Sequence, residues 1–131
     1  MSTHMKKVEV LSVLRALASK YAERNDFQKG LSYIERAEKL SKDLLQDQDH
    51  ELVLLLAATK VDILNKQHRF GTEEQRQIIL EVAKLALDQS KRMYGEDSLM
   101  TSKMMIDYGL TLMRMKSESS KTEGEQVLKK A

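Results

Sequence analysis

Cysteine, proline and tryptophan are absent from this chain of 131 residues, which has only two phenylalanines and five glycines. Without cysteine there is no disulfide framework, no thiolate nucleophile and no cysteine-bound zinc, which favours a cytoplasmic location. Without proline and with little glycine, helices can run long and few sharp turns are available. The aromatic side chains that would stack on nucleic-acid bases are also scarce.

Charge of one sign is not concentrated anywhere in the chain. The 22 basic and 20 acidic residues are interspersed and leave a net charge of +2, so we expect no nucleic-acid partner. No long uncharged apolar run is present, so we expect no membrane insertion. A content of 41% hydrophobic and 32% charged residues, rich in helix-forming types, predicts one globular all-α domain.

Apolar residues recur at steps of three and four, the pattern of helices with one buried face. This pattern predicts helices over about residues 6–24, 26–46, 50–66, 72–94 and 98–116. Asn25 and Asp26 are placed to end the first helix and to cap the second. Thr72 with Gln75 forms a capping-box pattern, and Gly95 is placed to end the fourth helix.

The apolar positions also predict which side chains are buried. On the fourth helix we expect one buried stripe, made of Ile78, Val82, Leu85, Ala86 and Met93. The fifth helix carries a group of methionines, Met104, Met105, Met113 and Met115. Methionine at helical spacing indicates either core packing or a pliable binding surface, and both interpretations stay open here.

Large and small residues alternate along residues 14–37 as they would where two antiparallel helices interlock. The positions are Leu14, Leu17, Ala18, Tyr21, Gly30, Ile34 and Ala37. Ala18 and Gly30 would let two helix backbones approach closely, while the large residues fill the grooves on either side. The match is to the large and small positions of a helix–turn–helix repeat.

The segments LSKDLLQDQDHELV (residues 40–53) and QSKRMYGEDSLMTS (residues 89–102) extend this pattern, with an underlying period of about 42 residues. The sequence thereby resembles the kinesin light chain-like branch of the tetratricopeptide repeat family, although Lys60 stands at a position for a small residue. The resemblance implies a right-handed solenoid of antiparallel helix pairs, with about five or six helices. It also implies a scaffold for protein–protein interaction.

We place repeats at about residues 8–46, 50–94 and 98–131, the last of them incomplete, and the repeat domain at 5–116. Residues 117–131 are expected to form a polar link and then a short helix from about Thr122. His4 and Met5 are the pair that common cloning junctions leave, so we interpret residues 1–4 as a cloning leader.

In such repeats the first helix of each pair lines a concave groove. The resemblance places these residues in the groove: Ser12, Arg15, Ser19, Ala22, Leu54, Ala57, Val61, Leu64, Lys103, Ile106, Leu110 and Met113. The groove residues of the middle repeat, from Leu54 to Leu64, are apolar, and Arg15 and Lys103 add positive charge. We therefore expect an acidic-hydrophobic peptide or an amphipathic helix of a partner protein in the groove.

Two alternatives remain at this point. The apolar groove residues would be covered if the tail helix or a further repeat packed on them. Leu110, Met113 and Val127 would instead mediate self-association, or docking onto further helical repeats, if the chain is a structural subunit.

The sequence contains no convincing set of catalytic residues. His50 and His68 lie far apart and lack a second ligand at helical spacing, so we expect no metal site and interpret them as a cap or loop histidine. We find no nucleophile–base set and no glycine-rich phosphate loop. The expected function is therefore a cytoplasmic, non-catalytic adaptor without a cofactor.

Overall fold

The computed structural model describes residues 3–45 and 47–131. These residues form six α-helices and no strand, which confirms the all-α prediction. The chain divides into two compact units, residues 1–64 and 65–131, and the boundary lies near the end of the third helix.

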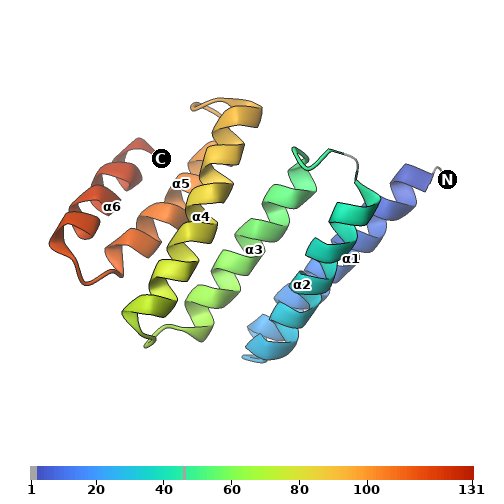
Figure 1. The fold of residues 1–131 in the computed structure, drawn as a ribbon, viewed down its shortest axis with the longest axis horizontal. Coiled ribbons are helices and arrows are strands. Elements are labelled where there is room, and N and C mark those ends of the chain that lie inside the picture. Colours follow the sequence, from blue (N-terminus) through green and yellow to red (C-terminus); the bar gives the residue numbers. More distant parts are fainter. Residues whose placement is uncertain (1–2, 46) are drawn as a thin grey trace. The chain divides into compact units, whose positions relative to one another are not determined.

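The first unit contains α1 (Thr3–Glu23), α2 (Phe27–Leu44) and most of α3 (Glu51–Gln67). Figure 1 shows that α1 and α2 run in opposite directions. Asn25 takes a left-handed conformation (φ +66°) between them, and the Asp26 carboxylate caps α2 by accepting from the Lys29 N–H at 3.2 Å. The predicted stop and cap at Asn25 and Asp26 are thus confirmed.

The core of the first unit is made by apolar residues from its three helices, chiefly Leu11, Leu14, Ala18, Ile34, Ala37, Leu52, Leu56 and Ile63. A Cβ atom added at Gly30 would lie 3.0 Å from the Ala18 carbonyl oxygen, so the predicted close approach at these two residues is confirmed. Lys60 is half-buried, and its ammonium lies 3.2 Å from the Glu38 carboxylate. A lysine is therefore tolerated at this small-residue position because its charged end finds a partner.

The second unit contains α4 (Glu73–Tyr94), α5 (Leu99–Met113) and α6 (Glu118–Lys130). The predicted capping box is confirmed: the Thr72 hydroxyl accepts from the Gln75 N–H at 3.2 Å, and the Gln75 side chain accepts from the Thr72 N–H at 2.9 Å. Gly95 ends α4 with φ +84°, also as predicted.

Two buried hydroxyl groups join the end of α4 to the start of α5. The Ser90 and Thr101 oxygens lie 3.0 Å apart, and both residues are fully buried. The Thr101 hydroxyl also lies 2.7 Å from the Gly95 carbonyl oxygen. Because these polar groups are satisfied where water is excluded, they fix the turn between the two helices.

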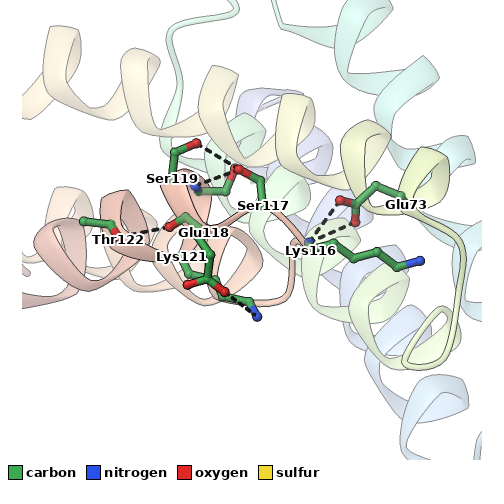
Figure 2. Close-up of polar contacts among 8 residues, drawn as sticks. Glu73, Lys116, Ser117, Glu118, Ser119, Lys121 and Thr122 are labelled. Carbon is green, nitrogen blue, oxygen red and sulfur yellow. Dashed lines mark hydrogen bonds and ion pairs between the residues drawn. The ribbon is translucent and has the colours of Figure 1, made fainter.

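The chain after α5 differs from the sequence prediction. We expected α5 to reach about residue 116 and the tail helix to start near Thr122, whereas α5 ends at Met113 and α6 begins at Glu118. The Ser117 hydroxyl caps α6, and the Glu73 carboxylate accepts from the Lys116 N–H at 3.0 and 3.3 Å (Figure 2). A polar segment rich in serine thus supplied a helix cap rather than a long link.

α6 lies against α5 because both helices carry glycine at their contact. A Cβ atom added at Gly124 would lie 2.8 Å from the Gly109 carbonyl oxygen, and one added at Gly109 would lie 2.8 Å from the Leu128 side chain. Met104, Leu112 and Met115 complete the core beside this contact.

We expect Gly124→Ala to lower the free energy of unfolding by about 1 kcal/mol or more. Alanine favours a helix by up to about 1 kcal/mol over glycine, but its Cβ would press on backbone, and overpacking costs about 1–3 kcal/mol. Urea unfolding followed by circular dichroism measures the difference. The control is Gln126→Ala at an exposed position of α6. If both variants were as stable as the parent chain, the glycine contact would not limit the packing of α5 and α6.

Candidate functional site

In the first unit, the predicted groove residues differ in their exposure. Ser12 is exposed and Arg15, Ser19, Ala57 and Leu64 are half-buried, whereas Ala22, Leu54 and Val61 are buried. The Arg15 Nε atom donates a hydrogen bond to the Thr59 hydroxyl at 3.0 Å. The Leu54 and Val61 side chains are 0% and 1% exposed, so we do not include them in the candidate surface.

In the second unit, the predicted groove residues share one open face of a helix. Lys103, Ile106 and Leu110 are exposed and Met113 is half-buried. The spacing of three and four residues places them on the same side of α5. Leu99, which sequence reasoning missed, precedes Lys103 by four residues and is 90% exposed. We call Leu99, Lys103, Ile106, Leu110 and Met113 the outer face of α5.

The outer face combines apolar surface with positive charge. Ile106 and Leu110 are 44% and 46% exposed, while Met104, Tyr108 and Leu112 of the same helix are buried. Lys103 precedes the two apolar residues, and the exposed Arg114 follows them. Among the residues that the structure describes, neither cation forms an ion pair. The face therefore offers a short apolar stripe with a cation toward each end.

The methionines of α5 and the turn after it belong mainly to the core. Met104, Met105 and Met115 are at most 8% exposed, whereas Met113 and Met100 are half-buried. The core interpretation of this group is therefore confirmed for three of the four residues.

α4 exposes a different stripe from the one predicted. Ile78 and Leu85 are 60% and 71% exposed, so their predicted burial is wrong. Ala86 is buried as predicted, and Val82 and Met93 are half-buried. The other buried residues are Ile79, Ala83, Leu87 and Ser90. The helix has apolar residues in two adjacent stripes, and periodicity alone does not decide which of the two faces the core.

A second surface lies on the other side of α5, around Tyr108. The Tyr108 hydroxyl lies 3.4 Å from the Glu123 carboxylate on α6, and the Lys84 ammonium lies 5.4 Å from the centre of its ring. Lys84 is also 3.4 Å from the Asp88 carboxylate. Burial raises the pKa of Tyr108 above its ordinary value of 10.0, and the negative charges of Glu123 and Asp88 raise this pKa further.

Residues 3–45 and 47–131 contain no group of three side chains that would hold a metal ion. Every buried side-chain polar atom described there has a hydrogen-bond partner. The His50 Nδ1 atom accepts from the Leu52 N–H at 3.0 Å, so His50 caps the start of α3, the role expected for it. None of the described helices has both the length and the apolar character needed to cross a bilayer.

No protein-family model, curated protein or solved structure matches this chain. The resemblance to tetratricopeptide repeats therefore stays a prediction based on its residues. The features of this chain that bear on its function are the surfaces described above, chiefly the outer face of α5.

The raised pKa of Tyr108 predicts a loss of stability at high pH. Above about pH 10 the unfolded chain releases the Tyr108 proton while the folded chain retains it, so the free energy of unfolding falls as pH rises. We expect this fall to be steeper for the parent chain than for Tyr108→Phe. Urea unfolding at a series of pH values from about 8 to about 11 measures both slopes. If the unfolding free energies of the two chains fell in parallel with pH, the prediction would be wrong. A constant difference between them would reflect only the lost contact of the hydroxyl group.

Proposed function

We propose that this chain is a non-catalytic scaffold that binds a peptide or helix of a partner protein. The observation that carries the proposal is the outer face of α5, where large apolar side chains stay exposed between Lys103 and Arg114. Apolar residues at this spacing, flanked by cations, suit an acidic-hydrophobic peptide or the apolar face of a partner helix.

The proposal includes a right-handed solenoid of antiparallel helix pairs, of the tetratricopeptide type and the kinesin light chain-like branch. The close backbone approaches at Gly30 and Gly124 support it, because each joins a first helix to the second helix of the same pair. The absence of cysteine from the sequence favours the cytoplasm as its location.

The exposed apolar side chains of the outer face would make a modest contribution to the free energy of binding. Full burial of a leucine or isoleucine side chain contributes about 1.5–3 kcal/mol, and Ile106 and Leu110 are each nearly half exposed. Covering both residues therefore contributes on the order of 2 kcal/mol. Lys103 would add orientation and faster association with an acidic partner rather than much affinity.

We expect Leu110→Asp and Lys103→Glu to weaken binding of peptides selected from an acidic-hydrophobic library, by about tenfold for Leu110→Asp. An aspartate would place an unpaired charge against the apolar side chain of the peptide. Fluorescence anisotropy measures the dissociation constants.

The matched controls are Ile78→Asp, at an exposed apolar residue of α4, and Lys39→Glu, at an exposed lysine of α2. Both should bind as the parent chain does, and circular dichroism checks that every variant folds. Equal weakening by Ile78→Asp and Leu110→Asp would show that the outer face of α5 is not the binding surface.

A second candidate function is that of a structural subunit that self-associates or docks onto further helical repeats. It is favoured by apolar exposure on helices of both units. Val10 and Val13 are 45% and 57% exposed on α1, Leu110 is 46% exposed on α5, and Val127 is half-buried on α6. A terminal helix of a repeat protein normally has a polar outer side.

Light scattering over a range of concentrations separates the two functions. The scaffold function predicts the mass of one chain throughout, because the outer face of α5 is then free for a peptide. A mass that rises toward two chains, and falls back to one in Leu110→Asp, would favour the structural subunit. A rise that only Val13→Asp reverses would place the self-association on α1 instead.

A further inference from the structure

A small pocket opens between α4 and α6 in the second unit, over the side of α5 that carries Tyr108. It has a volume of about 200 Å³. Lys84 and Lys91 of α4 and Glu123 and Lys130 of α6 lie around it. We call it the lysine pocket. Three helices contribute to it, and two of them are held together by the contact between Gly109 and Gly124.

Positive charge predominates around the lysine pocket, with three ammonium groups against one carboxylate. Lys84 already has the Asp88 carboxylate at 3.4 Å, and Glu123 already accepts from Tyr108. In the part of the chain that the structure describes, neither Lys91 nor Lys130 has an ion-pair partner. Each ammonium has three donors, so this pair can hold an anionic group.

Both of these lysines lie at helix ends. Lys91 lies in the last turn of α4 and Lys130 in the last turn of α6, where the helix dipole favours a cation. The dipole stabilises the charges without using the N–H groups of the ammonium. The helix dipole therefore leaves the ammonium donors available for a ligand.

Apolar side chains form the remainder of the pocket, notably Leu87, which is 2% exposed, and Met105, which is 8% exposed. An anion bound there would lose part of its water shell. Its attraction to the ammonium groups would then exceed that of an ion pair on the open surface.

A second hollow of about 400 Å³ adjoins the lysine pocket, since Lys84 and Tyr108 line both. Its other polar residues are Gln77 and Glu81. It is lined mainly by α4, with Leu80 and the 71% exposed Leu85 as its apolar residues. If a bound peptide placed an apolar side chain against Leu85, the next residues of that peptide would lie close to the lysine pocket.

We propose that the two adjoining hollows bind an acidic peptide segment of a partner protein. A glutamate or aspartate carboxylate would lie between Lys91 and Lys130, and an adjacent apolar side chain would pack on Leu80 and Leu85. This site goes beyond the outer face of α5, because Tyr108 and Ile106 are two residues apart and point to roughly opposite sides of the helix. The charge complementarity of the pocket selects an acidic occupant.

The test uses a synthetic array of acetylated and amidated peptides on a glycine-serine background. Each peptide carries one leucine and one glutamate at varied spacing, and a matched peptide carries glutamine in place of glutamate. We expect at least one spacing to bind about tenfold more tightly with glutamate than with glutamine. The array is measured on a chain that carries Leu110→Asp, in which the outer face of α5 contributes little to binding. Adding Lys91→Glu with Lys130→Glu should remove the preference, whereas adding Lys39→Glu should leave it unchanged.

Three results would overturn the proposal. They are equal binding of the glutamate and glutamine peptides, retention of the preference when Lys91→Glu and Lys130→Glu are added, and its loss when Lys39→Glu is added. Because Leu110→Asp weakens the outer face of α5 in all of these chains, the two sites fail separately. Lys91→Gln with Lys130→Gln repeats the measurement if the charge-reversed chain does not fold.

Inorganic phosphate serves as the competitor that tests the source of the anion. If phosphate displaces the best glutamate peptide at a lower concentration than free acetate does, the pocket selects phosphate groups, and the acidic-peptide assignment is wrong. If phosphate and acetate displace the peptide at similar concentrations, the result supports a carboxylate ligand.

Discussion

The close approach of helix backbones at small residues is the constraint on which the rest of the structure depends. Gly30 meets the Ala18 carbonyl group in the first unit, and Gly124 meets the Gly109 carbonyl group in the second. At such distances side chains on either side must interdigitate, because no atom larger than hydrogen fits between the backbones. The large residues of the core, such as Ile34 and Leu112, thereby acquire fixed positions.

This constraint also determines which surfaces of the second unit are open. α5 contacts both α4 and α6, so its residues Met104, Tyr108 and Leu112 are buried. On the outer face, Ile106 and Leu110 keep nearly half of their surface in water. Exposed apolar residues occur singly on most proteins, but a stripe at helical spacing indicates an interaction surface.

The sequence predicted features that depend on neighbouring residues better than those that depend on distant ones. The caps at Asp26 and Thr72 and the end of α4 at Gly95 need only local geometry, and all three were predicted correctly. The repeat register also placed Lys103, Ile106 and Leu110 on one helix, and the structure leaves all three exposed. The start of α6 was wrong because Ser117 caps the helix in a segment that composition alone marks as a link.

The misassigned face of α4 and the lysine pocket share a physical cause. Both depend on how α4, α5 and α6 are rotated about their axes, and this rotation is fixed by contacts between residues far apart in sequence. The bond between Ser90 and Thr101 and the contact between Gly109 and Gly124 set it. A substitution that loosens either contact would alter both surfaces of α5 together, whereas one at Leu110 or Lys130 would alter a single surface. A change in binding can therefore be assigned to a single surface when the variant has the same unfolding free energy as the parent chain, and not otherwise.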